Sequence, residues 1–341
     1  MGAYDLSFDE VWSRLAALGQ PAYRARQVWD GLYRHGTLPR ELTVLPKALR
    51  EQLDWGTSLQ QAAESVGDGG DTVKWLWRLD DDRFVETVLM HHPRWSTVCV
   101  SSQAGCAMAC SFCATGQAGF DRHLTTGEIV EQVVHARRVA ATSGRRLSNV
   151  VFMGMGEPLA NCEPVWTAVE RLHDDLGLSA RHVTVSTVGV VPGIQRLAAE
   201  RLPVNLAVSL HAANDELRDS LVPLNRRYPL EVLAGACRSY LAVKGRRLSF
   251  EWALIDGVND RVSDAGELAA FVRPLGAHVN LIPLNPTPGY ATRGTPPDGV
   301  RAFRDRLVAL GVNATVRRNR GTDIDAACGQ LRAVTISRLT N

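Results

Sequence analysis

The sequence contains no apolar run that approaches the ~20 residues needed for a membrane-spanning helix. Its first ten residues are acidic rather than basic and lack an apolar segment, so no secretory signal is recognisable. Cysteine occurs seven times, an odd number, and the three cysteines closest together are spaced for metal binding rather than for disulfides. We therefore expect a cytoplasmic protein with no membrane association.

Lysine is scarce, with residues only at Lys47, Lys74 and Lys244. The 38 basic residues are nearly balanced by 36 acidic ones, so the net charge of +2 does not indicate a polyanionic partner. Arginines often occur in adjacent pairs, which we expect at exposed helix ends and loops. The arginines of residues 317–320 are an exception, because they directly precede a second chemical motif near the end of the chain.

The length of 341 residues and the 45% apolar content suggest about two domains. From about residue 98, short β-branched runs alternate with amphipathic stretches of helical length, which is typical of βα units around a parallel sheet. Six such units are too few to close an eight-stranded barrel, so we predict an α/β fold with a partial (βα)6 barrel. Strands are expected at 97–101, 149–153, 182–186, 204–210, 249–254 and 278–283. Helices are expected at 126–141, 163–176, 193–199, 230–243, 263–271 and 297–310.

The chain before this core divides into two further parts. Amphipathic segments at 8–18, 23–33 and about 46–53 predict a small N-terminal helical accessory domain over residues 1–60. A glycine-rich linker is predicted at 60–71, followed by strands at 72–79 and 83–90, so that residues 61–91 form a linker and β extension. The core is then 92–322, and the C-terminal segment is 323–341.

Three cysteines, Cys106, Cys110 and Cys113, follow the first predicted strand at the spacing C-x3-C-x2-C. A closed zinc site needs four ligands, whereas a cubane cluster held by three cysteines leaves one iron open for another ligand. A degenerate zinc knuckle or three free thiols is the alternative. The spacing resembles that of the radical S-adenosylmethionine (SAM) superfamily, in which the fourth iron of a [4Fe-4S] cluster binds SAM.

The second predicted strand ends in residues 154–158, Gly-Met-Gly-Glu-Pro. A glycine such as Gly156 lets the backbone approach a ligand closely, and the carboxylate of Glu157 can accept hydrogen bonds from the ammonium group of SAM. A simple turn is the alternative interpretation of this stretch.

Polar side chains also follow the later strands. Ser186 ends the third strand and Ser209-Leu210-His211 ends the fourth, where they could contact the ribose or carboxylate of SAM, although such residues are often helix caps. Asn285 lies in a proline-rich stretch after the sixth strand, and its amide could pair with the adenine or ribose of SAM. A turn is again the alternative.

Cys328 lies among small residues in the segment 323–331, where we find no packing reason for a cysteine. By contrast, Cys237 lies inside an apolar helix and is expected to be structural. Cys99 lies on the first predicted strand, with its side chain near the mouth of the barrel.

Taken together, these motifs resemble the RlmN/Cfr family of radical SAM RNA adenine methyltransferases. The resemblance covers nearly the whole chain and depends on residues 99–106, the cysteine triplet, and residues 153–158, 209–212, 254–260 and 323–331. Pro158 and the 323–328 sequence are more similar to the RlmN branch, which methylates carbon 2 of adenine. This resemblance implies a dual-specificity enzyme acting on 23S rRNA and on the adenine beside the anticodon of certain tRNAs.

The resemblance also implies roles for particular residues. In this family one SAM methylates the cysteine matching Cys328, and a second SAM is cleaved at the cluster, so that two are used per turnover. The activated methyl group then adds to the ring, and the glutamate matching Glu86 removes a proton from the ring carbon. The cysteine matching Cys99 attacks the sulfur of Cys328, which releases the product and leaves a transient disulfide.

The partners implied are 23S rRNA, tRNA and an electron donor such as flavodoxin or ferredoxin, with the protein itself a monomer. The helices around Pro21, Arg24 and Arg26 resemble the family's RNA-binding module, which would contact phosphates. Two alternatives stay open from the sequence: Cfr-like methylation of carbon 8, and an iron-sulfur electron carrier or redox sensor without a substrate of its own. A catalytically silent RNA-binding protein is a further alternative.

Overall fold

The computed structural model describes residues 2–286, 291 and 293–331. Within these residues, ten strands form one sheet in the order β1-β2-β3-β4-β7-β8-β9-β10-β11-β12. The strands from β4 onward run parallel to one another. They are β4 (Trp95–Cys99), β7 (Arg146–Phe152), β8 (Val183–Thr187), β9 (Asn205–Ser209), β10 (Leu248–Leu254), β11 (His278–Pro283) and β12 (Ala314–Val316).

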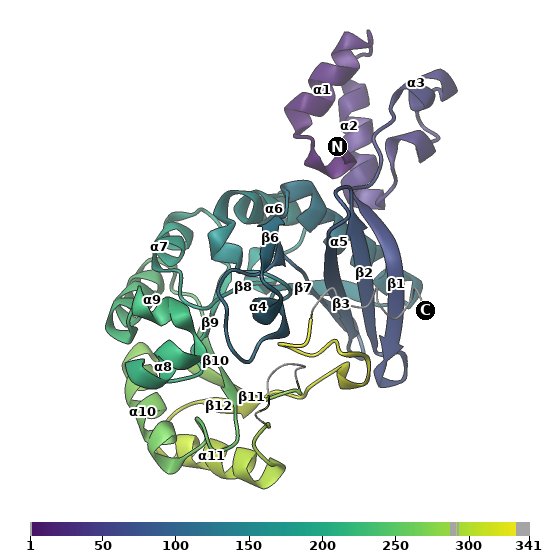
Figure 1. Ribbon diagram of the computed structural model, residues 1–341. Helices are drawn as coiled ribbons and strands as arrows, with labels where there is room; N and C mark the ends of the chain where they lie inside the picture. The colour runs from purple at the N-terminus through teal and green to yellow at the C-terminus, as the bar shows by residue number, and fades with distance from the viewer. Residues whose placement is uncertain (1, 287–290, 292, 332–341) are drawn as a thin grey trace.

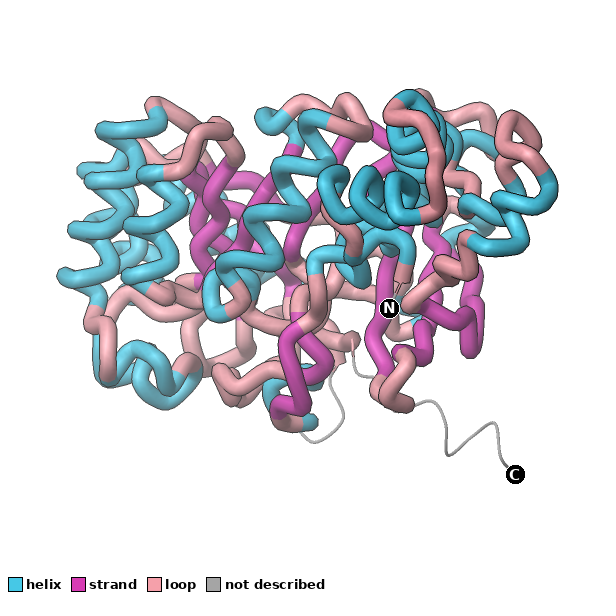
Figure 2. Tube along the Cα trace, turned by 90° about the horizontal axis from the view of Figure 1, so that it is seen from above, coloured by secondary structure: helices cyan, strands magenta, loops and turns pink. Residues whose placement is uncertain are grey.

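Helices cover the outer face of this curved sheet, while the loop before α4 and the C-terminal segment lie on its inner side (Figure 1). Seen from above, many of the loops gather along one side of the molecule (Figure 2). The partial barrel predicted from the sequence is therefore confirmed. The outer helices are α5 (Thr126–Thr142), α6 (Cys162–Asp174), α7 (Val191–Ala199), α9 (Leu230–Lys244), α10 (Val262–Val272) and α11 (Pro297–Ala309).

Three elements of the barrel were not predicted. Strand β12 has three residues and lies outside the six predicted units, and the helices α4 (Ala114–Ala118) and α8 (Asp215–Leu221) are short. Segments of this length carry too few residues for a hydrophobic period to stand out. Helix α4 nevertheless contributes Thr115 and Gly116 to the wall of the site described below, and α8 supports the cysteine loop through the carbonyl of Leu221.

The predicted linker at 60–71 is wrong. Most of it is strand β1 (Leu59–Gly67), which pairs antiparallel with β2 (Thr72–Leu79), and β2 pairs in turn with β3 (Phe84–His91). Because β1 is an edge strand with mixed polar and small side chains and exposed or half-buried central residues, its sequence lacks the apolar alternation of a half-buried strand. Strand β3 pairs antiparallel with β4, so the β1–β3 extension continues the barrel sheet.

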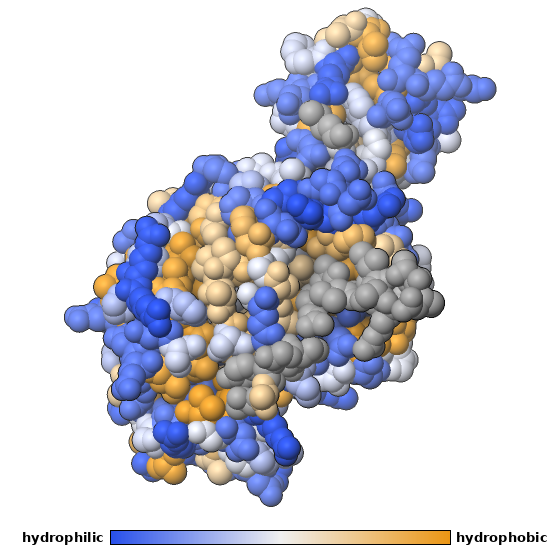
Figure 3. Space-filling model, viewed as in Figure 1, coloured by the Kyte–Doolittle hydropathy of each residue, from blue (hydrophilic) through white to orange (hydrophobic). Residues whose placement is uncertain are grey.

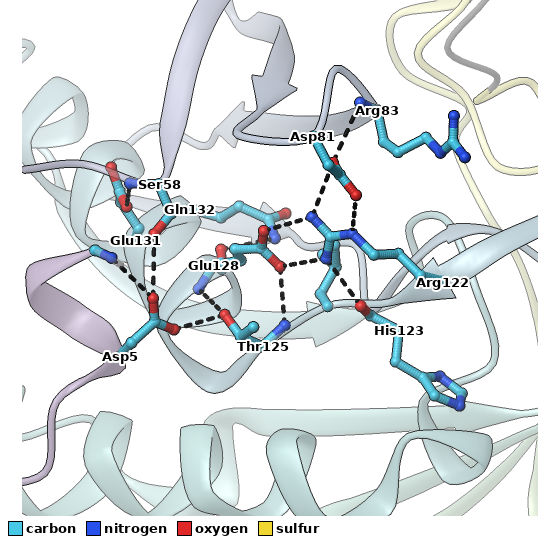
Figure 4. A network of polar contacts seen from close by, with 12 residues as sticks. Asp5, Ser58, Asp81, Arg83, Arg122, His123, Thr125, Glu128, Glu131 and Gln132 are labelled. Atoms are coloured by element: carbon cyan, nitrogen blue, oxygen red, sulfur yellow. Dashed lines mark hydrogen bonds and ion pairs between the residues drawn. The ribbon is translucent and has the colours of Figure 1, made fainter.

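The N-terminal helices α1 (Phe8–Ala17), α2 (Tyr23–Asp30) and α3 (Lys47–Gln52) form the predicted helical group. Ser7 and Glu10 make a capping box at the start of α1. The adjoining segments are tied to α5 by hydrogen bonds from Thr125 to Asp5 (2.7 Å) and from the Ser58 amide to Glu131 (2.9 Å) (Figure 4). Among the described helices, none is long and apolar enough to cross a membrane.

Candidate functional site

The cysteine triplet lies in a loop between β5 (Gln103–Gly105) and α4. The Cys106 amide donates to the carbonyl of Gly119 (2.6 Å), and the Cys113 amide donates to the carbonyl of Cys110 (3.2 Å). Ser111 donates its amide to the carbonyl of Leu221 in α8, which fixes the loop against the barrel (3.2 Å). All three thiols line one cavity on the inner side of the sheet.

The donor set of this cavity suits an iron-sulfur cluster. Thiolates are the ligands of such clusters, and the three cysteines share one cavity wall. In the described part of the chain, no three His, Cys, Asp or Glu side chains converge on a position for one metal ion. Cysteines around a cubane bind different irons, so they need not converge in this way. Burial is the main cause that raises the pKa of Cys106 to about 12 and the pKa values of Cys110 and Cys113 above the ordinary value.

The glycines after β7 leave no space for a Cβ atom, because the segment that follows β4 passes close to them. A Cβ on Gly154 would lie 2.6 Å from the carbonyl oxygen of Val100, and one on Gly156 would lie 2.5 Å from the Cβ of Gln103. Gly156 also has a φ of +100°. Gly156 lines the cysteine cavity, and the close approach that the structure shows is to Gln103, while its approach to a ligand stays a prediction.

Glu157 is 2% exposed, and backbone amides contact both of its carboxylate oxygens. Leu159 donates to Oε1 (2.9 Å) and Val188 donates to Oε2 (2.8 Å), so the carboxylate both caps a turn and joins the ends of β7 and β8. Burial raises the pKa of Glu157 to about 7. The side chain lines the cysteine cavity, so the turn and the ligand interpretations are compatible.

The other predicted SAM contacts fall into two groups. Ser186, Ser209 and His211 line the cavity, whereas Leu210 does not and its side chain is completely buried. The Leu210 amide and carbonyl are engaged by the carbonyl of Glu251 and by Arg218. His211 accepts a hydrogen bond from the Ala253 amide at Nδ1 (2.9 Å), and burial lowers its pKa to about 3, so the ring is neutral.

The segment that carries Cys328 lies between the β1–β3 extension and α4 (Figure 1). Asn285 donates to the carbonyl of Cys328 (3.2 Å), and the amide of Ala114 donates to the carbonyl of Gly329 (2.8 Å). Asn285 lines the cavity, and its amide nitrogen also positions Cys328, while its pairing with SAM stays a prediction. Residues 287–289 of its motif and residues 332–341 of the C-terminal segment lie outside the described residues.

Cys99 and Cys328, far apart in the sequence, line a second cavity together with Arg317. Cys99 ends β4 and is 5% exposed, while Cys328 is half-buried. Burial, followed by the neighbouring Cys328, raises the pKa of Cys99 to about 12. Cys328 is the main cause that raises the pKa of Arg317, with a further contribution from Glu251. The guanidinium group is therefore placed to stabilise negative charge on the Cys328 sulfur.

Glu86 lies on β3, on the same face of the sheet as Val88, which pairs with Cys99. It is 1% exposed and forms an ion pair with Lys74 of β2 (3.2 Å). Lys74 also donates to the carbonyl of Asp325 (3.1 Å), three residues before Cys328. Glu86 is not among the residues that line either cavity, and Lys74 connects it to the Cys328 segment.

Sequence reasoning missed Lys74 and Arg218. Lys74 is one of only three lysines, but its importance depends on the pairing of β2 with β3. Arg218 on α8 is 1% exposed and donates to the carbonyls of Leu210 and Val188 (3.1 and 2.7 Å), which fixes the ends of two strands. A lone arginine in a short amphipathic stretch gives no signal for such a role.

The two arginines expected to contact phosphates make contacts inside the helical group. Arg24 donates to Gln27 (2.7 Å) and to the carbonyl of Val44 (2.9 Å), and Arg26 lies over the ring of Phe8. In the view of Figure 3, hydrophilic residues cover much of the helical group and the rim of the barrel, while apolar residues gather near the middle of the face.

Comparisons with known proteins agree with this geometry. Residues 100–269 match the radical SAM superfamily. The chain is 51% identical to the dual-specificity RNA methyltransferase RlmN 1 of Myxococcus xanthus, over 97% of this chain and 94% of that protein. It is 49% identical to a probable dual-specificity RNA methyltransferase RlmN of Chloroflexus aurantiacus, over 96% of this chain and 92% of that protein. The crystal structure of a radical SAM methyltransferase from Sphaerobacter thermophilus superposes with a TM-score of 0.95 and 52% identity, over 98% of this chain and 99% of that one. This chain therefore belongs to the RlmN family of radical SAM RNA methyltransferases.

Proposed function

We propose that this enzyme methylates carbon 2 of an adenine in 23S rRNA and of the adenine next to the anticodon in tRNA. The relatives named as dual-specificity RNA methyltransferases support this choice of substrates. The observation that carries the mechanism is the cavity shared by Cys99 and Cys328 beside the cavity of the cysteine triplet. A carrier of electrons alone has no use for this second pair of cysteines.

Cys106, Cys110 and Cys113 are proposed to hold a [4Fe-4S] cluster, and Glu157, Ser186, Ser209 and His211 to contact SAM. When bound, the cluster and two molecules of SAM per turnover supply the methyl group and the one-electron chemistry. Glu157 accepts from the ammonium group of SAM, because its carboxylate is fixed in the cavity wall. Leu210 is not included, because its side chain lies in the core.

Cys328 is proposed to carry the methyl group to the RNA. Arg317 lies beside its sulfur, and Asn285 fixes its backbone. After the carbon has joined the adenine ring, Glu86 takes the proton from the ring carbon. Cys99 then attacks the sulfur of Cys328 as a thiolate, which breaks the bond between sulfur and carbon and leaves a disulfide between the two cysteines. The electron pair of the broken bond stays with the carbon, which takes up a proton and becomes the methyl group of the product.

We further propose that residues 1–60 contact the RNA, that the protein is a cytoplasmic monomer, and that flavodoxin or ferredoxin supplies its electrons. The test of the main proposal is an anaerobic assay of the reconstituted protein on unmodified 23S rRNA fragments and on tRNA. The position of the new methyl group is then located by fragmentation of the modified nucleoside. Methyl on carbon 2 in both RNAs supports the proposal, whereas methyl on carbon 8 assigns the chain a Cfr-like activity instead.

A further inference from the structure

The second cavity has a volume of about 420 Å³ and extends along the inner face of the sheet. Side chains at alternate positions of β3, β4 and β7, together with one residue directly after β7, form its floor. The floor residues are Val88, Met90, Thr97, Cys99, Val151 and Met153. Met90, Thr97 and Val151 are half-buried rather than fully buried, so solvent reaches this face. Cys328 and Arg317 also line the cysteine-triplet cavity, which places them in the wall between the two cavities.

The charge around this cavity has one sign. Arg317, Arg318 and Arg320 line it, and no carboxylate does so among the described residues. His92 also lines it, but burial and then Arg320 lower the pKa of this histidine, so the arginines carry the positive charge. Arg320 donates to the carbonyl of His91 (2.6 Å), while Arg318 is exposed. An anionic molecule is therefore favoured in this cavity over a neutral or cationic one.

The proposed function, on which this inference rests, leaves a disulfide between Cys99 and Cys328 after every turnover. A new turnover requires two electrons at this disulfide, delivered by a thiolate that reaches one of its sulfurs. Cys99 is 5% exposed and lies on the floor of the second cavity, so access to the pair is through this cavity. The triplet cavity is the proposed position of the cluster and SAM.

We propose that the second cavity is a binding site for an anionic low-molecular-weight thiol, which reduces the disulfide between Cys99 and Cys328. The thiolate attacks the sulfur of Cys328, the more exposed of the two, and Cys99 leaves as a thiolate beside Arg317. A second thiol attacks the mixed disulfide and releases Cys328. Two thiols are thereby oxidised to one disulfide, and their two protons go to Cys99 and Cys328.

The test measures the reverse reaction, in which an added disulfide oxidises Cys99 and Cys328. By microscopic reversibility this reaction uses the same binding site, and it needs neither RNA nor methyl transfer. The reduced, cluster-loaded enzyme is mixed anaerobically with oxidised glutathione, which is anionic, or with hydroxyethyl disulfide, which is neutral. Differential alkylation and mass spectrometry give the rate at which Cys99 and Cys328 become linked. In Arg318→Gln/Arg320→Gln the rate with glutathione should fall about tenfold, while the rate with hydroxyethyl disulfide changes less than about twofold. The control Arg301→Gln/Arg304→Gln, on α11 and outside the lining of this cavity, should match the wild type.

Saturating S-adenosylhomocysteine separates the two cavities, because it competes with SAM for the triplet cavity. If the exchange rate is unchanged with S-adenosylhomocysteine bound, the disulfide reagent enters through the second cavity. If S-adenosylhomocysteine blocks the exchange, the proposal is overturned. The proposal would also be overturned if Arg318→Gln/Arg320→Gln changed the exchange rate with oxidised glutathione no more than the rate with hydroxyethyl disulfide. RNA methylation is assayed separately, so a failure of the proposed function is distinguished from a failure of this inference.

Discussion

Lys74 Nζ lies 3.2 Å from Oε1 of Glu86, and the two side chains are 10% and 1% exposed. The same ammonium group donates to the carbonyl of Asp325 (3.1 Å), so one buried cation connects two strands of the β1–β3 extension with the Cys328 segment. Removing one member of a buried ion pair leaves the other charge without compensation, which is more costly than removing both.

We therefore expect Lys74→Met to lower the free energy of unfolding by about 3 kcal/mol. Lys74→Met/Glu86→Gln should recover more than half of this loss, because the glutamine carries no charge to be compensated. Urea unfolding monitored by circular dichroism measures both variants. Equal losses in the single and double variants would show that the ion pair does not determine the effect.

Replacing Cys328 and replacing Cys99 should block the reaction at different steps. Cys328→Ala removes the methyl carrier and should give neither methylated protein nor RNA adduct. Cys99→Ala leaves the carrier but removes the thiol that resolves it, so a covalent protein–RNA species should accumulate and survive denaturation. The adduct should be absent from Cys99→Ala/Cys328→Ala on denaturing gels. Normal release of methylated RNA by Cys99→Ala would contradict the role of Cys99.

Replacing any cysteine of the triplet should remove most of the bound iron and abolish SAM cleavage, because two thiolates do not hold the cubane. Cys110→Ala is the most direct example, measured by iron content and by 5′-deoxyadenosine production. Cys237→Ala, in the core on α9, is the matched control and should retain its iron. Full iron content in Cys110→Ala would argue against the cluster assignment.

Glu157→Gln should weaken SAM binding by about 10- to 100-fold, since a hydrogen bond to a charged group contributes about 1.5–3 kcal/mol. The absorbance of the cluster should stay unchanged, because the proposed contact is with SAM and not with iron. Equilibrium binding of SAM to the loaded protein measures the effect. Glu163→Gln, on the exposed start of α6, is the control, and equal affinities in the two variants would leave Glu157 with a structural role alone.

Glu131 of α5 should make the free energy of unfolding depend on pH. Burial raises its pKa from 4.5 to about 8, so between these values the folded chain keeps a proton that the unfolded chain releases. The free energy of unfolding should therefore fall as the pH rises from 4.5 to about 8. Glu131→Gln should reduce this slope in urea unfolding at a series of pH values, whereas the exposed Glu231→Gln should keep it. An unchanged slope in Glu131→Gln would exclude Glu131 as its source.

The alternation of strands and helices in the barrel follows from local pattern. Residues 126–141 show the apolar spacing of a helix on a sheet, and α5 occupies Thr126–Thr142. Strand β1 was missed for the opposite reason, since its polar residues carry no local signal and its structure depends on pairing with β2. The pairing of two strands depends on both of their sequences, so it cannot be predicted from the local pattern of one strand alone.

By itself, the sequence determined the partial barrel, the cysteine triplet and the distinct character of Cys328, because these depend on periodicity and on spacing between neighbours. Only the tertiary structure decided which distant residues meet. It placed Arg317 beside Cys328, used Asn285 to fix the backbone of that cysteine, and turned the side chain of Leu210 into the core. The physical reason is that burial and charge pairing act between side chains across space, and strand register and loop path set those distances.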